Sequence, residues 1–303
     1  MNYKESIKNF VDRLPYVRTL KKKAIFYESR LTVAPGHFYS PIVDSDEIIE
    51  NENKIFDPNR SLEGIVLNKE AQFELLNIFK EYYKLLPFTE EPINTNRYFY
   101  NNDAYSYSDA IFLFSITMHY KPQRIIEIGS GYSSAAMLDI NEKFFSNSID
   151  LTFIEPFPET LKYRTRQGDK YTLIEKKVQD ADSNIFKSLK ENDILFIDST
   201  HVAKTNSDVL FELFEILPVL CKGVKVHIHD IFYPFEYPKE WVIDQKRNWN
   251  EIYLLRAFLM YNSIFKIIAF NTYAEQINAP WFEENMPLCL KNRGGSIWLE
   301  KIG

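Results

Sequence analysis

The sequence predicts an α/β fold with a mostly parallel sheet, and three observations lead to this expectation. Residues Arg124–Ser134 read RIIEIGSGYSS, a β-branched run that ends in a glycine turn and is followed by good helix formers. Residues 150–155 (DLTFIE) form a second short apolar run that ends in an acid. Two further apolar runs, 194–198 and 224–230, alternate with helical patterns. Such alternation is typical of doubly wound sheets with helices on both faces.

The glycine turn Gly129-Ser130-Gly131 indicates a nucleotide site. Glycines let the backbone approach a ligand where a Cβ would clash, and the helix that follows offers free N–H groups at its N-terminus. A dinucleotide fingerprint has a third glycine where this chain has Ser134, and no Gly-Lys-Ser/Thr run of a P-loop follows. The preceding strand carries an acid, Glu127, shortly before the first glycine.

Length and composition exclude several classes of protein. The 303 residues are enough for one large domain or for a domain with an appendage, and the net charge of −6 does not favour nucleic acid as a partner. Cys221 and Cys289 lack CxxC spacing, which excludes disulfide scaffolds and zinc ribbons. The start of the chain lacks the apolar core of a signal peptide, and no apolar run is long enough to span a membrane. We therefore expect a soluble, cytoplasmic protein.

The N-terminal third is predicted to consist of helices and loops. Residues 1–30 have the pattern of one or two short helices, and the basic run within 18–23 favours a solvated helix face over contact with an acidic membrane. The aromatic loop Ala34–Pro41 either closes over a site or packs Phe38 and Tyr39 as an Ω-loop. Residues 68–86 have the spacing of an amphipathic helix, with Asn68 or the residue before it as its cap.

A loop rich in tyrosine leads into the first strand of the sheet. Residues Tyr98–Tyr107 (YFYNNDAYSY) place aromatic side chains around Asn101, Asn102 and Asp103. Ser108-Asp109 then has the composition of an N-cap for a helix that runs to about His119. The loop is expected either to lie over a bound cofactor or to form a surface turn whose tyrosines only pack.

The remaining elements follow from apolar runs bounded by turn residues. Further strands are expected at 171–177, 264–270 and 296–300, and further helices at 185–190, 208–220 and 251–260. Residues 232–241 (FYPFEYPKEW) are expected to form a lid or an acceptor-binding loop. Gly294-Gly295 fits a turn into the last strand.

Polar side chains stand where the strands at 194–198 and 224–230 end. Asp198 and His201 follow the first of these strands, and His229 and Asp230 end the second. Open α/β sheets bind ligands beyond the carboxyl ends of their strands. These groups are therefore expected to hold a divalent cation, to deprotonate a hydroxyl, or to form an ion-pair and hydrogen-bond network. His227 lies in mid-strand, which favours a hydrogen-bonded interior histidine.

Glu155 ends the strand at 150–155. In Rossmann-like folds, an acid at the end of the second strand accepts hydrogen bonds from ribose hydroxyls, because one carboxylate can take both. The alternative is an exposed glutamate that has no ligand. Glu155 and the glycine turn together favour a nucleoside ligand.

The run E-I-G-S-G-Y-S resembles the first motif of class I S-adenosylmethionine (SAM)-dependent methyltransferases. The resemblance extends from about Tyr98 to the C-terminus. It is sharpest in IDSTHVAKTNSDVLFELFEILPVL and VHIHDIFYPFEYPKEWV, which are similar to a bacterial branch near the metal-dependent small-molecule and sugar O-methyltransferases. It implies a Rossmann-like, mostly parallel seven-stranded sheet, a helix before the first strand and an antiparallel pair of strands at the C-terminus.

The resemblance also implies roles for single residues. The turn Gly129-Ser130-Gly131 would pass under the methionine part of SAM, and Glu127 would help to orient its amino group. Asp180, with Asp182 as a rival, matches the position that meets the adenine amino group. Asp198 and Asp230 match two positions that bind Mg²⁺ in the metal-dependent relatives, and Asp198 also belongs to the expected cofactor site. His229 stands where the relatives often carry a carboxylate.

Together these patterns predict residues 1–95 as a helical and loop cap, and 96–303 as a methyltransferase domain. The expected reaction is methyl transfer from SAM to an oxygen of a small molecule or sugar. His201, His229 or a metal such as Mg²⁺ or Mn²⁺ would activate the hydroxyl, beside Asp230. An NAD(P)-dependent oxidoreductase and a non-catalytic SAM- or glycan-binding protein remain alternatives, and assembly into a homo-oligomer is left open.

Overall fold

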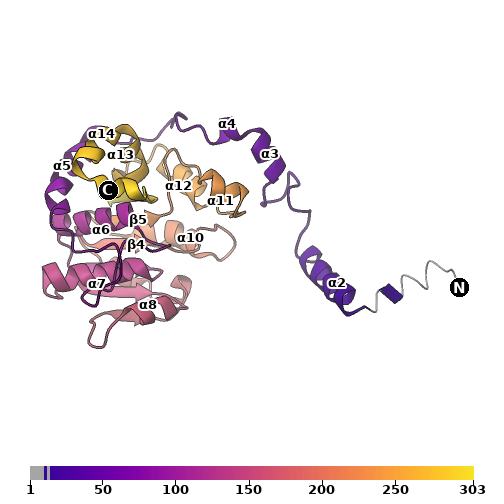
Figure 1. The fold of residues 1–303 in the computed structure, drawn as a ribbon, viewed down its shortest axis with the longest axis horizontal. Coiled ribbons are helices and arrows are strands. Elements are labelled where there is room, and N and C mark those ends of the chain that lie inside the picture. The colour runs from indigo at the N-terminus through magenta and orange to yellow at the C-terminus, as the bar shows by residue number, and fades with distance from the viewer. Residues whose placement is uncertain (1–9, 12–13) are drawn as a thin grey trace. The chain divides into compact units, whose positions relative to one another are not determined.

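The computed structural model describes residues 10–11 and 14–303, which form two compact units. One unit comprises the described residues up to Ile55 together with Lys239–Asn248, and the other comprises Phe56–Pro238 and Trp249–Gly303. The second unit contains the sheet (Figure 1). Its residue ranges also include every predicted site residue. The larger unit begins at Phe56, upstream of the domain boundary that the sequence predicts near residue 95. That boundary stays a prediction.

The smaller unit consists of short helices. They are α2 (Pro15–Glu28), α3 (Ser45–Glu50), α4 (Glu52–Ile55) and α11 (Lys239–Ile243). Asp44 caps α3 by accepting a hydrogen bond from the backbone N–H of Asp46 (3.0 Å). In the loop at 34–41 the rings of Phe38 and Tyr39 are 81% and 76% exposed, so the alternative that buries them in an Ω-loop is wrong.

The larger unit contains a seven-stranded sheet in the order β3-β2-β1-β4-β5-β7-β6. Its strands are β1 (Arg124–Ile128), β2 (Asp150–Ile154), β3 (Thr172–Ile174), β4 (Ile194–Ile197), β5 (Lys225–His229), β6 (Phe265–Phe270) and β7 (Ser296–Lys301). The first five strands run parallel, and β7 lies antiparallel between β5 and β6. The predicted mostly parallel sheet with an antiparallel C-terminal pair is therefore confirmed.

The third strand is shorter than the predicted 171–177. It ends at Ile174, because the backbone N–H of Lys176 turns back to the Ile174 carbonyl (2.8 Å) and leaves the ladder.

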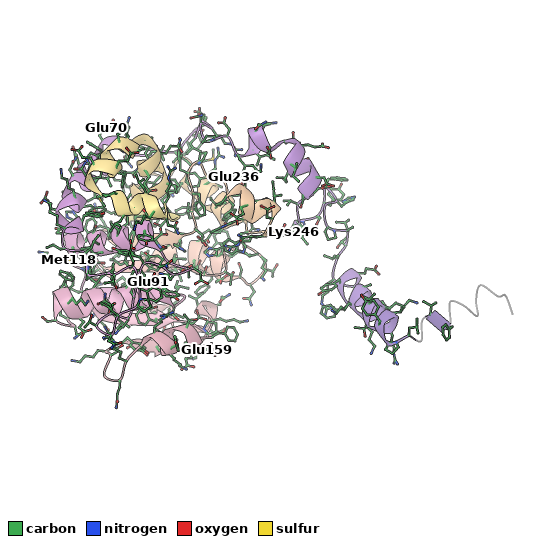
Figure 2. All side chains as sticks on the ribbon, in the orientation of Figure 1. Glu70, Glu91, Met118, Glu159, Glu236 and Lys246 are labelled. Carbon is green, nitrogen blue, oxygen red and sulfur yellow. The ribbon has the colours of Figure 1, made fainter. Side chains whose placement is uncertain are left out.

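The helices of the larger unit flank the sheet. They are α5 (Lys69–Tyr83), α6 (Tyr107–Tyr120), α7 (Tyr132–Phe145), α8 (Glu159–Arg164), α9 (Asn184–Lys187), α10 (Asp208–Phe211), α12 (Glu251–Leu259), α13 (Asn271–Ile277) and α14 (Ala279–Asn285). Helix α6 is apolar almost all round, and it packs against both α5 and α7. Exposed acids such as Glu70 and Glu159 project from the outer helices (Figure 2).

Helix α6 begins earlier than predicted. Its N-cap is Ser106, whereas Ser108 and Asp109 lie buried in the first turn. The reason is long-range: Ser108 Oγ donates to the Glu275 carboxylate, and Asp109 Oδ1 accepts from the Gly295 backbone N–H at 3.2 Å. Side chains that satisfy distant groups are not available to cap their own helix.

Asn68 precedes α5 as predicted but makes no capping hydrogen bond with its side chain. Its amide donates to the Ile267 carbonyl (3.1 Å), while the Gln72 side chain accepts from the Phe270 N–H (2.9 Å). Both bonds cover the outer edge of β6, which would otherwise leave strand groups unpaired.

Candidate active site

The glycine turn after β1 is held against the end of β4. Gly129 has a φ of 97°, and a Cβ added there would lie 2.1 Å from the Asp198 carbonyl oxygen. Gly131 is different, because its backbone is extended and an added Cβ would meet only Thr160 Cγ2, at 3.7 Å. Gly129 is therefore required by the fold, while the space beside Gly131 is left for a ligand.

A cavity of about 250 Å³ opens beside this turn. It is lined by Asp103, Ala104, Tyr105, Ser130, Gly131, Tyr132, Ser133, Thr160 and Asp198. The lining includes two aspartates and no lysine or arginine. A pyrophosphate would meet only like charge here, so the cavity suits a cationic ligand better than a dinucleotide.

The hydroxyl of Ser130 supplies a polar group for such a ligand. Its Oγ is buried and has no hydrogen-bond partner among residues 10–11 and 14–303. Buried polar groups are nearly always paired, so an orphan hydroxyl in a cavity wall indicates a missing ligand or water. SAM, which carries an ammonium, a carboxylate and a sulfonium, fits this lining.

Glu127 is completely buried in β1 beneath the turn. Its carboxylate accepts hydrogen bonds from the hydroxyls of Ser133 and Ser134, and Ser134 Oγ also accepts from the Gly131 N–H (3.0 Å). Burial raises the pKa of Glu127 to about 8 despite the two hydroxyl donors. Glu127 therefore ties the start of α7 to β1, and its expected contact with the SAM amino group stays a prediction.

The two acids expected around the nucleoside are placed differently. Glu155 follows β2, is half-buried, and accepts from the Phe157 N–H at 2.8 Å, while burial raises its pKa. Asp180 is exposed in the short helix η1 (Val178–Asp180). None of Glu155, Asp180 and Asp182 lines the 250 Å³ cavity. The contact of Glu155 with ribose and the contact of Asp180 with adenine therefore both stay predictions.

The predicted cluster at the ends of β4 and β5 does come together. The strands are parallel neighbours, and His201 Nε2 lies 3.6 Å from an Asp198 oxygen and 3.4 Å from an Asp230 oxygen. His229 Nε2 lies 3.6 Å from the other oxygen of Asp230. Because Asp198 also lines the 250 Å³ cavity, it joins the candidate cofactor site to this histidine cluster.

The charges in the cluster compensate one another. Burial alone would raise the pKa of Asp198, but His229 and His201 outweigh it and lower the pKa to about 2. Burial likewise disfavours charge on His201, yet hydrogen bonds to Asp198 and Glu251 hold its pKa well above 6.5. The surrounding carboxylates therefore favour the protonated form of His201.

Three consecutive residues that the sequence did not single out fix His201. Glu251 Oε2 lies 2.9 Å from His201 Nδ1, and the centroid of the Trp249 ring, which is tilted by 39°, lies 4.4 Å from that of the imidazole. The backbone N–H groups of Asn250 and Glu251 donate to the His201 carbonyl, and the Asn250 side chain accepts from the Ala203 N–H at 2.6 Å. These contacts hold His201 at a φ of 59°, which is unusual for a residue with a side chain.

Comparison with known proteins places the chain in a family. A sequence profile described as a methyltransferase domain matches residues 126–231, which include the glycine turn, Asp198, His201 and Asp230. The chain belongs to the class I SAM-dependent methyltransferase family. An uncharacterized protein of the archaeon Archaeoglobus fulgidus is 40% identical over 168 residues, which cover 52% of this methyltransferase and 74% of the relative.

Several solved methyltransferases are similar at low identity. PaMTH1 of Podospora anserina, bound to S-adenosylhomocysteine (SAH), shares 14% identity over 90% of this chain and 100% of its own, with a TM-score of 0.39. The plantazolicin methyltransferase BpumL, with a triazolic analogue and SAH, shares 16% over 86% and 100% of the two chains, with a TM-score of 0.42. The O-methyltransferase TomG of Streptomyces achromogenes, with SAM, shares 13% over 85% and 96%, with a TM-score of 0.38. Likenesses at this level carry no argument about acceptor or mechanism.

Two sequence-based expectations for this methyltransferase change. His227 is an interior histidine as predicted, but the hydrogen bonds expected of it are missing: neither ring nitrogen has a partner within the described residues. Its ring lies against Phe196 (3.8 Å) and Trp298 (4.6 Å), and burial lowers its pKa well below 6.5. His227 is thus a neutral packing residue.

The metal role predicted for Asp198 and Asp230 receives no support from the geometry. Among residues 10–11 and 14–303, no group of three or more histidines, cysteines or acids is arranged to hold a metal ion. The positive charge between the two aspartates is supplied by His201.

The part of this methyltransferase that the structure describes also contains no helix long and apolar enough to cross a membrane.

Proposed function

We propose that this methyltransferase transfers a methyl group from SAM to a hydroxyl oxygen of a small molecule or sugar. The observation that carries the proposal is the double role of Asp198, which lines the cavity and lies 3.6 Å from His201 Nε2. A basic side chain so close to the cofactor cavity is what transfer to a hydroxyl requires, because the acceptor must lose its proton as it attacks.

Cofactor binding in this proposal uses the residues around the turn. Gly131 and the Ser130 hydroxyl would face the methionine part, and Glu155 would accept from the ribose hydroxyls. When bound, SAM supplies an electrophilic methyl group on a sulfonium. The protein's task is then to hold the acceptor oxygen in line with that methyl, and such positioning accounts for much of catalysis in transfer reactions.

We assign proton removal to His201. Glu251 fixes the imidazole through Nδ1, so Nε2 is the nitrogen directed at Asp198 and Asp230. The base is the neutral imidazole, and Asp198 and Asp230 stabilise the imidazolium that forms when it takes the proton. His229 is 4% exposed and its pKa is also raised by both aspartates against burial, so we give it a supporting electrostatic role.

A SAM-dependent methylation screen with mass detection, over sugars, sugar nucleotides and phenols, tests the proposal. We expect one acceptor class to gain a single methyl on oxygen, and His201→Asn to abolish turnover while SAM still binds. Transfer to nitrogen or sulfur only, or SAM binding without turnover on any acceptor, would contradict it. The same assay in EDTA tests the predicted Mg²⁺ or Mn²⁺, since activity that vanishes and returns with either ion would restore the metal role of Asp198 and Asp230.

The expected cap and lid are also proposals. Residues 98–107 belong to the wall of the cavity through Asp103, Ala104 and Tyr105, which supports the prediction that this loop lies over the cofactor. We further propose that residues 1–95 and 232–241 contribute to acceptor binding. Deletion of Ala34–Pro41 should then raise KM for the acceptor and leave the affinity for SAM unchanged.

A further inference from the structure

The loop at 98–107 is organised by hydrogen bonds among its own residues. Asn102 organises it: its Oδ1 accepts from the N–H groups of Ala104 (3.1 Å) and Tyr105 (2.7 Å), and its Nδ2 donates to the Phe99 carbonyl (2.7 Å). The Tyr98 hydroxyl donates to the Tyr105 carbonyl at 2.8 Å. Asp103 therefore lies on a hydrogen-bonded turn between Asn102 and Ala104.

Asp103 brings an unbalanced negative charge to the cavity. Asp198, the other aspartate of the lining, faces the imidazolium of His201. Asp103 is exposed and forms no ion pair within residues 10–11 and 14–303, and no lysine or arginine lines the cavity. The net field of the wall on a ligand is thus set largely by Asp103.

The cavity is small enough that a charge anywhere on a bound ligand interacts with the Asp103 carboxylate. A space of about 250 Å³ is about 8 Å across, which is no more than one Debye length at physiological salt. SAM and its product SAH differ in one charge, because loss of the methyl group converts a sulfonium into a neutral thioether. A carboxylate in the cavity wall therefore stabilises the sulfonium of the cofactor and leaves the thioether of the product unaffected.

We propose that Asp103 sets the preference of this cavity for the sulfonium cofactor over its neutral thioether product, and so limits product inhibition. The inference rests on the proposed placement of SAM beside the glycine turn. It gives the loop at 98–107 a function beyond covering the site, namely to select the charged form of the ligand.

Calorimetric titration of the full chain with SAM and with SAH tests the inference. Asp103→Asn keeps the shape of the side chain and removes its charge. We expect it to weaken SAM binding by about threefold to tenfold and to change SAH binding by less than about twofold. The SAM-to-SAH preference of the wild type should also fall as salt is added, and the variant's preference should respond less. Glu215→Gln, an equal charge change at an exposed position outside the cavity lining, should alter neither affinity.

The outcomes separate the inference from the function on which it rests. Equal loss of SAM and SAH affinity in Asp103→Asn would overturn it, because Asp103 would then bind a part that both ligands share. Unchanged affinity for both would overturn it as well. A wild-type chain that binds neither ligand would instead refute the cofactor placement itself. Thermal unfolding of the variant at the wild-type temperature shows that the loop is intact.

Discussion

His201 Nδ1 lies 2.9 Å from the Glu251 carboxylate, so a buried acid orients the imidazole whose other nitrogen faces Asp198 and Asp230. The pair joins the loop after β4 to the first turn of α12. A histidine held in this way has one fixed tautomer when neutral and a stabilised charge when protonated. The role of His201 in the reaction therefore depends on pH, which sets whether the imidazole is neutral or protonated.

The first prediction concerns the pH dependence of turnover. The carboxylates raise the pKa of His201 well above 6.5, so the neutral, basic form appears only above that raised value, and kcat should rise with pH through it. Glu251→Gln removes one of these charges and should lower the pKa. The rise in kcat then moves to lower pH, while the plateau falls because the ring is less well oriented. A profile of kcat from about pH 5.5 to about 9.5 measures both effects.

Glu212 provides a matched control for Glu251. It is equally buried and burial likewise raises its pKa, but its carboxylate accepts a hydrogen bond from the Ser199 hydroxyl (3.2 Å) and not from His201. Glu212→Gln should therefore leave the pH profile in place. Coincident profiles for the wild type and Glu251→Gln would remove His201 as the base.

The second prediction concerns stability. The pKa of Glu127 is about 8 in the folded protein because of burial, against 4.5 as its ordinary value. Its contribution to folding is complete below pH 4.5 and is lost as pH rises through about 8, since the unfolded chain releases the proton first. The Gln side chain of Glu127→Gln has no proton to lose. The free energy of unfolding of this variant should therefore rise relative to that of the wild type between these pH values, by at most about 5 kcal/mol. Urea unfolding at about pH 5 and about pH 9 measures the difference.

The third prediction separates the two glycines of the turn. Gly129→Ala should lower stability by on the order of a few kcal/mol, because its Cβ collides with the Asp198 carbonyl and its φ is positive. Gly131→Ala should fold normally, since its Cβ meets nothing closer than 3.7 Å, yet it should weaken SAM binding by narrowing the cavity. Thermal unfolding and SAM titration of both variants measure this. Normal SAM affinity in Gly131→Ala would place the cofactor elsewhere.

Much of the sheet could be predicted because each strand is an apolar run with its own turn signals. The strand at 194–198 and the strand at 224–230 were therefore recognised, and the meeting of Asp198 with Asp230 followed from parallel neighbours ending at one edge. The histidine cluster was predictable for the same reason. The group that neutralises Asp198 and Asp230 could not be predicted. Either a metal ion or the imidazole of His201 can do so, and the sequence is the same in both cases.

Contacts between distant segments account for what the sequence did not reveal. Glu251 is separated from His201 by 50 residues, and no pattern distinguishes it from an ordinary acid in the first turn of a helix. The start of α6 was misplaced because Ser108 and Asp109 bond to Glu275 and Gly295, which lie 167 and 186 residues away. Local rules of capping describe a helix only where its first side chains have no distant partner.

The last prediction concerns the nucleoside part of the cofactor. The Glu155 carboxylate accepts from the Phe157 N–H (2.8 Å), and in the proposed binding mode it also accepts from the ribose hydroxyls. Glu155→Ala should weaken SAM binding by roughly 1.5–3 kcal/mol, the usual loss when hydrogen bonds to a charged group are removed. Asp180→Ala, at an exposed position outside the cavity lining, should cost less if the adenine group lies elsewhere. Calorimetry of both variants decides between the acids, because a larger loss at Asp180 would move the nucleoside towards η1 and away from β2.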